Sequence, residues 1–328
     1  MRNALLFAVL ALAACGAPPK PAADPPLGDA PPANDAPAAS KADSDVAAAE
    51  AALKDGDLPR AKKAVEAALA KDPKSARAHY YAGVAGEGLG DKEGAEKHYR
   101  EALALAPGLS DAAVNLSALL LDGGRAADAV AVLKPFAGKG DPMVSANYAA
   151  VLAATGDHAG AIAAYESAMK GAAGDLRVRL GYAEELLAAG RKDDAAKALR
   201  DGLATAEGNR DALAAMARSL AKAGAYDDAI KAIDRAIKLK ASADLYTYRA
   251  LFRRGAKDAP GARADLESAL KEDPKFAPAH VYLGEVLEEL KKPAEAKKEY
   301  ERAIELAGDS GPGKKAKERL EALKGKKP

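Results

Sequence analysis

The sequence predicts an all-α fold in which pairs of short helices stack one after another. Two observations carry this prediction. Alanine dominates the apolar content: 49% of the residues are hydrophobic, only 5% are aromatic, and there is no tryptophan. Alanine is the strongest helix former and buries little area, which suits closely spaced helices. In addition, from about Ala42 onward one pattern of small and large apolar residues returns every 32 to 34 residues, which is typical of a repeat array.

The first three residues, Met-Arg-Asn, carry one positive side chain, and a ten-residue apolar run from Ala4 to Ala13 follows. This run is shorter than the about 20 residues that span a bilayer core, but it has the length of a secretory signal core. The following residues, Leu12 to Cys15, read Leu-Ala-Ala-Cys and resemble the lipobox of bacterial lipoproteins. The resemblance implies a signal peptide at residues 1–14 and an acyl or diacylglyceryl lipid on Cys15. An ordinary signal peptide with an accidental cysteine is the alternative.

The lipobox resemblance also implies a location. Lipoproteins of this kind carry two or three acyl chains such as palmitate, and each buried methylene contributes about 0.8 kcal/mol to membrane binding. Gly16 follows the cysteine where many lipoproteins retained in the inner membrane have Asp, so we expect the outer membrane, facing the periplasm. Residues 15–41 are rich in Pro and Ala and are expected to form a disordered tether, although a low-complexity leader of no particular length would look the same.

The repeat itself predicts two helices per copy. One alanine marks the same position in each copy: Ala61, Ala95, Ala129, Ala161, Ala195, Ala229, Ala262 and Ala296. Four residues later comes a larger apolar residue, and three residues after that usually another alanine. Positions i, i+4 and i+7 share one helix face, so this helix carries a small–large–small stripe. Twelve residues before each marker a small residue, such as Gly83 or Gly284, predicts a first helix that approaches the second closely.

Turn residues separate the predicted helices. In six copies a glycine lies five residues before the marker alanine, where a left-handed conformation ends the first helix. Asp57, Asp91 and Asp157 directly follow three of these glycines and are placed to cap the second helix. Pro73, Pro107 and Pro274 are expected to follow the ends of second helices.

A 34-residue helix–turn–helix unit with these residues resembles the tetratricopeptide repeat. Residues 76–109 carry the resemblance best, through Gly83, Gly90, Ala95, Tyr99, Ala102 and Pro107. It implies a right-handed α-solenoid of about eight repeats at residues 42–310, followed at 311–328 by a capping helix and a basic tail. The capping helix is expected at 314–323, after a loop at 308–313. The usual tryptophan is absent throughout, and Arg249 and Arg253 stand at normally apolar sites, which puts the first helix of the seventh repeat in question.

The resemblance implies that a protein or an extended peptide binds in the concave groove lined by the first helices. The candidate groove residues are Tyr80, Tyr81, Val84, Asn115, Asn147, Leu180, Arg218, Tyr248, Tyr282 and Glu285. Exposed Tyr and Arg are common anchors of interfaces, although several of these side chains could instead pack against adjacent repeats. No repeat carries the Lys and Asn pair with which chaperone-binding members hold a C-terminal carboxylate.

Several function classes are disfavoured. The net charge of +1 argues against a nucleic-acid partner, which usually requires a basic excess. No nucleophile, base and orienting group can be assembled, and His79 and His280 occupy equivalent repeat positions, which indicates packing and not metal binding. Residues 308–315 resemble a phosphate-binding loop, but Lys315 replaces the expected Ser or Thr and no strand precedes it. We therefore expect no enzyme activity, no cofactor, no metal and no small-molecule substrate.

The resulting interpretation is a lipid-anchored scaffold or adaptor of the cell envelope. By resemblance alone, its process would be secretin, pilus, motility or outer-membrane assembly. Two alternatives stay open: a self-associating or peptidoglycan-linked spacer, and a non-catalytic accessory subunit of an envelope enzyme. A concentration-dependent oligomer in light scattering would favour the spacer.

Overall fold

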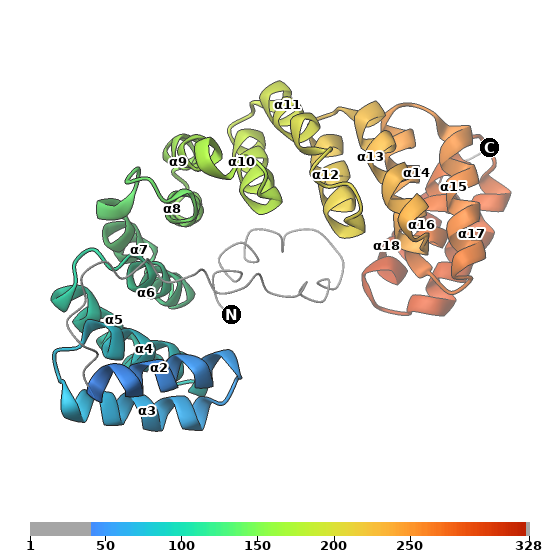
Figure 1. Ribbon diagram of the computed structural model, residues 1–328. Helices are drawn as coiled ribbons and strands as arrows, with labels where there is room; N and C mark the ends of the chain where they lie inside the picture. The colour runs from blue at the N-terminus through green and yellow to red at the C-terminus, as the bar shows by residue number, and fades with distance from the viewer. Residues whose placement is uncertain (1–40, 326–328) are drawn as a thin grey trace. The chain divides into compact units, whose positions relative to one another are not determined.

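The computed structural model describes residues 41–325, which form helices and turns and contain no strand. The predicted all-α solenoid is confirmed: helices follow one another in antiparallel pairs (Figure 1). Contacts divide the chain into two units, residues 1–172 and 173–328. We call their described helices the N-terminal stack (α2–α9) and the C-terminal stack (α10–α18). The predicted signal peptide, Cys15 and nearly all of the tether lie outside the described residues.

The N-terminal stack contains four helix pairs. They are α2 (Lys41–Lys54) with α3 (Leu58–Lys71), α4 (Ala76–Leu89) with α5 (Lys92–Leu105), α6 (Ser110–Asp122) with α7 (Ala126–Leu133), and α8 (Pro142–Ala154) with α9 (His158–Ala172). The second helix of each of the first three pairs packs against the first helix of the next pair. Each pair therefore shields its neighbour, as a repeat array requires.

The C-terminal stack by itself has the same arrangement of paired helices and adds a last helix. Its helices are α10 (Leu176–Ala188), α11 (Lys192–Gly202), α12 (Arg210–Lys222), α13 (Tyr226–Leu239), α14 (Ala243–Gly255), α15 (Ala259–Glu272), α16 (Ala277–Glu289), α17 (Pro293–Ala307) and α18 (Gly311–Gly325). The last helix packs on both α16 and α17. It begins at Gly311, three residues earlier than predicted, because Pro312 is tolerated in a first helical turn. Leu320 and Leu323 pack against the core, as expected for a cap.

The predicted stripe forms the core of both stacks. All of the marker alanines are fully buried, and the larger residue four positions on is buried in every copy. The small residues of the first helices are close to these larger side chains. A Cβ atom on Gly83 would lie 2.4 Å from the ring of Tyr99, and one on Gly284 would lie 2.4 Å from the ring of Tyr300. The two helices of a pair therefore approach as closely as the sequence predicts.

The turns between paired helices also follow the prediction. Asp57, Asp91 and Asp157 each accept a hydrogen bond from the backbone N–H three residues on. The glycine before each of them has a positive φ. In the last two complete pairs a lysine takes the place of this glycine, and Lys257 (φ 66°) and Lys291 (φ 61°) adopt the same left-handed conformation.

Lys257→Gly should stabilise the C-terminal stack. A side chain in the left-handed region costs about 1–2 kcal/mol, whereas glycine loses about 0.5–1 kcal/mol through its greater freedom in the unfolded chain. A net gain of about 0.5–1 kcal/mol is expected in urea-induced unfolding. Gly224→Lys, the reverse change at an equivalent turn, should destabilise, and a loss of stability with Lys257→Gly would contradict the assignment.

Two second helices are shorter than the pattern predicts. Pro135 ends α7 at Leu133, and a 3₁₀ turn (Lys134–Phe136) follows, because proline cannot continue an α-helix. In the C-terminal stack, α11 ends at Gly202, where a Cβ atom would lie 2.0 Å from the side chain of Arg179. The Arg179 guanidinium is buried and donates to the carbonyl oxygens of Ala198 and Ala173, so Gly202 departs from the alanine pattern to leave it room.

The doubtful first helix of the seventh repeat is intact as α14, because its two arginines are paired inside the stack. The Arg249 guanidinium binds both carboxylate oxygens of Asp265 and also Asp234. Arg253 Nε lies 3.3 Å from Asp265 Oδ2, and Asp265 is only 2% exposed. Burial alone would lower the pKa of Arg249, but these two carboxylates raise it. Two cations thus occupy normally apolar sites because a buried carboxylate neutralises them.

Candidate partner-binding surface

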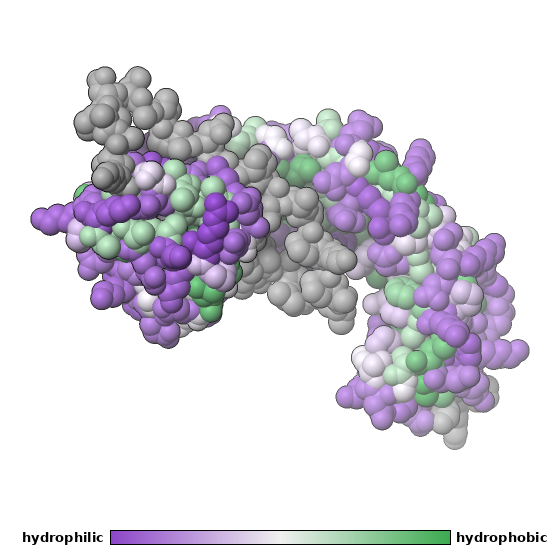
Figure 2. Space-filling view, turned by 60° about the horizontal axis from the view of Figure 1, so that its bottom comes forward, coloured by the Kyte–Doolittle hydropathy of each residue, from purple (hydrophilic) through white to green (hydrophobic). Residues whose placement is uncertain are grey.

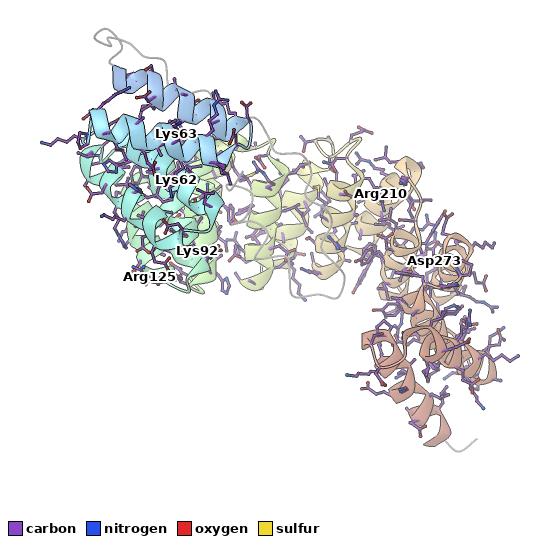
Figure 3. All side chains as sticks on the ribbon, turned by 90° about the horizontal axis from the view of Figure 1, so that it is seen from below. Lys62, Lys63, Lys92, Arg125, Arg210 and Asp273 are labelled. Atoms are coloured by element: carbon purple, nitrogen blue, oxygen red, sulfur yellow. The ribbon has the colours of Figure 1, made fainter. Side chains whose placement is uncertain are left out.

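All of the predicted groove residues lie on first helices of the helix pairs. We call the side of these helices that bears the candidates the first-helix surface, and we describe it for each stack by itself. Figure 2 shows hydrophilic residues over most of the visible surface of the protein, with apolar residues in smaller patches between them. The second helices carry exposed cations, such as Lys62 and Lys63 on α3 (Figure 3).

In the N-terminal stack, two neighbouring tyrosines on α4 dominate this surface. The rings of Tyr80 and Tyr81 are half-buried, and their centroids are 5.1 Å apart. Val84, one turn further along α4, packs with Tyr80 against the core. Burial, followed by a hydrogen bond with Glu50, raises the pKa of Tyr81 to about 12, so its hydroxyl group stays protonated at neutral pH. The helix therefore presents an aromatic and apolar face with a neutral polar edge.

A buried polar network supports these tyrosines from below. The Tyr99 hydroxyl group donates to Glu87 Oε2 over 2.6 Å, and Asn115 Nδ2 lies 3.5 Å from the same hydroxyl oxygen. Burial first, and then the Glu87 carboxylate, raise the pKa of Tyr99. Because the Tyr80 ring packs at 6.2 Å from Tyr99, this network holds the aromatic face in place. Asn115 is half-buried and so lies at the edge of the candidate surface.

The predicted groove residue Asn147 is buried in α8. Its side chain is 1% exposed, and its amide group donates to the Met143 carbonyl oxygen over 2.9 Å. Neighbouring positions on α8 are small apolar residues such as Ala146 and Ala150, which are themselves buried.

In the C-terminal stack, Arg218 and Tyr248 form one continuous feature across two first helices. The Arg218 guanidinium lies over the Tyr248 ring at 5.3 Å, and one nitrogen atom is 3.4 Å from the hydroxyl group. Tyr248 stacks on Phe252 with a centroid distance of 6.4 Å. Arg218 is exposed, whereas Tyr248 and Leu180, which lies on α10, are half-buried. A cation over a ring face is attracted to it, and Arg and Tyr side chains are common anchors of protein interfaces.

Near the C-terminal end of the C-terminal stack, ion pairs between side chains of the stack cover part of the first-helix surface. Glu285 is 6% exposed and bridges Arg254 of α14 and Lys315 of α18. The Lys315 ammonium group also lies 4.5 Å from the Tyr282 ring centroid. The predicted groove residue Glu285 is therefore neutralised within the chain and does not present a free charge. Tyr282 remains half-buried beneath the same lysine.

Two acidic residues on the surface of the N-terminal stack are not among the predicted groove residues. Asp111 lies in the first turn of α6, and Asp141 is the N-cap residue of α8. Loss of solvent and then repulsion from Asp141 raise the pKa of Asp111. The two residues are 30 positions apart in the sequence and lie at the starts of α6 and α8, two first helices that contact each other.

The equivalent histidines pack between helices, as predicted. His79 Nε2 and His280 Nε2 lie 3.0 and 3.2 Å from the carbonyl oxygens of Pro73 and Pro274. Their Nδ1 atoms differ in partner: His79 contacts His98 Nδ1 at 3.1 Å, whereas His280 contacts Glu299 at 2.7 Å. Within residues 41–325, no group of three or more His, Cys, Asp and Glu residues is arranged to hold a metal ion.

The two histidine environments predict opposite responses to pH. Burial would lower the pKa of His280, but its bonds to Glu299 and the Pro274 carbonyl raise it overall. Its charged form therefore stabilises the fold fully below the unfolded pKa of about 6.5, and this contribution is lost as pH rises through the folded pKa. Burial and then the neighbouring His79 lower the pKa of His98, so its contribution is present above pH of about 6.5 and lost on acidification.

His280→Gln should accordingly cost more stability at pH 5.5 than at pH 8.5, and His98→Gln should show the reverse order. Urea-induced unfolding of each variant at both pH values measures this. Equal pH dependence of the two variants would contradict the assigned contacts.

None of the helices between residues 41 and 325 is long and apolar enough to cross a lipid bilayer.

The comparisons with known proteins agree with this architecture. A family profile described as tetratricopeptide repeat matches residues 46–110, 115–175 and 180–244, and a second profile with the same description matches residues 152–207 and 253–322. A search of curated protein sequences gives no match.

Among solved structures, the chain is similar to a tetratricopeptide repeat protein from Parabacteroides merdae, with 16% identity and a TM-score of 0.50 over 76% of this chain and 99% of that one. Yeast Tom70 matches with 16% identity and a TM-score of 0.49 over 88% of this chain and 65% of that one. YrrB, described as a TPR protein with an unusual peptide-binding site, matches with 16% identity and a TM-score of 0.43 over 57% and 97% of the two chains.

These structural similarities concern the fold alone. The first family profile spans more than half of the sequence, and its matches fall on the stacked helix pairs described above. The chain belongs to the tetratricopeptide repeat family.

Proposed function

We propose that the protein is a membrane-anchored adaptor of about eight tetratricopeptide repeats that holds a partner protein against its first-helix surfaces. It would serve the assembly of a cell-envelope machine such as a secretin, a pilus, a motility apparatus or the outer-membrane assembly machinery. A scaffold that binds proteins is the function that this family of repeats supports in general. The anchor and the machine are inferred from the lipobox resemblance at Cys15.

The observation that carries the binding role is the preorganised Arg218–Tyr248 pair. Its two residues come from different repeats and reach the same surface, where the guanidinium group is exposed. Ordering a long side chain usually opposes binding by about 0.5–1.5 kcal/mol, and here the ring contact restricts Arg218 before a partner arrives. The Tyr80 and Tyr81 pair offers a comparable rigid anchor in the N-terminal stack.

Crosslinking in intact cells tests the binding role. We expect the full chain to capture a defined partner, and a variant with Tyr80→Ala, Tyr81→Ala and Arg218→Ala to lose at least tenfold of that capture. Lys62→Ala with Lys63→Ala, on the exposed side of α3, is the matched control and should capture as the natural chain does. The single variant Arg218→Glu should also lose capture but keep the stability of the natural chain, because Arg218 is exposed. It therefore distinguishes a loss of binding from a loss of folding. Unchanged capture by the triple variant would exclude this surface.

Membrane anchoring has its own test. Cys15→Ser removes the only cysteine and should release the protein into the soluble fraction after cell disruption, because the acyl chains supply the membrane affinity. Ala14→Ser leaves a small residue before the cysteine and serves as the control that should stay with the membranes. Sedimentation of Cys15→Ser with the membranes would refute the lipid anchor but not the binding role.

A further inference from the structure

His79 and His98 bring two ring nitrogen atoms together within the second helix pair. His79 lies in the first turn of α4 and His98 near the middle of α5, and their Nδ1 atoms are 3.1 Å apart. The ring centroids are 5.3 Å apart, and the ring planes are tilted by 41°. Both rings are half-buried, so solvent still reaches them. The pair therefore joins two helices through side chains that are also common metal ligands.

The contact of His79 with the preceding turn determines which of its nitrogen atoms keeps a lone pair. His79 Nε2 lies 3.0 Å from the Pro73 carbonyl oxygen. A carbonyl oxygen can only accept, so Nε2 carries the hydrogen atom and Nδ1 of the neutral ring has the lone pair. Histidines that bind metal ions donate their other N–H group in this way, which fixes the orientation of the ring.

The His98 ring can offer its Nδ1 lone pair as well. Within the described part of the chain, His98 Nε2 has no hydrogen-bond partner. Because that atom is not committed to an acceptor, the hydrogen atom of the neutral ring can reside on Nε2 and leave Nδ1 unprotonated. Both Nδ1 lone pairs are then available to one ion.

The separation of the two Nδ1 atoms suits a single metal ion. Zn²⁺ binds imidazole nitrogen atoms at about 2.0–2.1 Å, and at these lengths the 3.1 Å separation corresponds to an N–Zn–N angle of about 100°. This angle is close to that of the tetrahedral coordination that Zn²⁺ prefers. The two imidazole rings would supply two of the four positions, and water would supply the others.

The eighth repeat contains the equivalent pair with a different second residue. His280 and Glu299 are 19 residues apart in the sequence, as are His79 and His98. His280 Nε2 lies beside the Pro274 carbonyl oxygen and Nδ1 beside the Glu299 carboxylate. Both nitrogen atoms of this ring face acceptors, so both hold hydrogen atoms and neither has a lone pair for a metal ion. The two repeats thus share a geometry but differ in chemistry.

We propose that His79 and His98 form a binding site for one divalent metal ion that prefers nitrogen ligands, such as Zn²⁺. The ion would crosslink α4 to α5, and α4 carries Tyr80 and Tyr81. The site departs from the sequence-based expectation that the chain binds no metal, because only the pairing of the two helices brings these rings together. Mg²⁺ and Ca²⁺ do not fit, because they take oxygen ligands. The site does not depend on the proposed adaptor function.

Isothermal titration calorimetry with Zn²⁺ at neutral pH tests the site. The full chain is used without a histidine tag and with Cys15→Ser, so that no thiol binds the ion. We expect one Zn²⁺ per chain, and binding at least tenfold weaker with His79→Gln or with His98→Gln. His158→Gln, which removes a histidine outside the pair, is the matched control and should bind Zn²⁺ as the parent chain does. An excess of Mg²⁺ should not displace the Zn²⁺.

A variant that gains a site makes the test independent of any loss of folding. Glu299→His should give the eighth repeat the same pair of rings, so the chain should bind two Zn²⁺ ions, whereas Glu299→Gln should bind one. Zn²⁺ should also raise the urea concentration at which the parent chain unfolds and leave that of His98→Gln unchanged, because an ion that binds only the folded state stabilises it.

Equal Zn²⁺ affinity of the parent chain and the His98→Gln variant would overturn the proposal. So would a folded parent chain that binds no Zn²⁺, which would show that the two histidines share only a hydrogen bond. A Glu299→His chain that binds no additional ion would show that two histidines at this spacing do not suffice, and would also refute it. Partner capture through Arg218 is unaffected by these outcomes and decides the adaptor function separately.

Discussion

Asp265→Ala should destabilise the C-terminal stack by about 3–5 kcal/mol, the penalty for removing one partner of a buried ion pair. The carboxylate of Asp265 is 3% exposed and neutralises the guanidinium groups of Arg249 and Arg253. Without it, Arg249 keeps only Asp234, and Arg253 keeps only its bond to the Gly261 carbonyl oxygen. Two half-buried cations would then share a single, partly exposed carboxylate, that of Asp234.

Chemical unfolding of the full chain, together with hydrogen exchange across α14 and α15, measures this loss. Asp234→Ala is the control: that side chain is 38% exposed, so its removal should cost less than about 1 kcal/mol. Replacing Asp265, Arg249 and Arg253 together by Leu, Met and Leu should recover most of the stability, since apolar residues can replace a buried ion cluster. A loss below 1 kcal/mol for Asp265→Ala would contradict the buried cluster.

Gly284→Ala should destabilise the same stack by about 1–3 kcal/mol through overpacking, although alanine is a better helix former than glycine by about 1 kcal/mol. The added Cβ atom would lie 2.4 to 2.8 Å from three atoms of the Tyr300 ring. Tyr300 is fully buried, and its hydroxyl group is fixed to Glu288 over 2.7 Å. The ring therefore cannot move aside without losing both packing and a hydrogen bond.

The sign of this effect should reverse when the ring is removed. Tyr300→Ala alone should cost about 3–5 kcal/mol, as expected for deleting a buried aromatic side chain. In that background Gly284→Ala should become neutral or stabilising, because the clash is gone and the helix preference remains. Gly311→Ala, where a Cβ atom would meet nothing within 4 Å, is the matched control in both backgrounds. Additive effects of Gly284→Ala and Tyr300→Ala would show that the two residues are not in contact.

The parts of the fold that were predicted correctly from sequence depend on short spacings. The small–large–small stripe, the capping aspartates and the turn glycines involve residues within about one helix pair. Helical periodicity and turn chemistry determine where such residues lie. Gly83 and Tyr99 illustrate this: they are 16 residues apart, and their contact follows from the pairing of two helices alone.

The features that could not be predicted depend on neighbours in the next repeat or on exceptional partners. Glu285 occupies a repeat position typical of the groove, but Arg254 and Lys315 cover it from the helices on either side. The position of a residue within the repeat determines the helix face on which it lies. It does not determine which side chains of neighbouring repeats contact that residue. The ion cluster around Asp265 could not be predicted for a related reason. In the sequence, Arg249 and Arg253 are only exceptions to an apolar pattern, and their shared carboxylate becomes evident only in the folded structure.

Photo-crosslinking at single positions tests the central claim most directly. An azidophenylalanine in place of Tyr81 or Tyr248, on first helices, is compared with one in place of Lys63 or Lys231, which are exposed on second helices. If partner proteins bind the first-helix surfaces, the same partner should be captured at Tyr81, at Tyr248 or at both, and not at the two lysine positions. Capture confined to Lys63 and Lys231, or equal at all four positions, would contradict the claim.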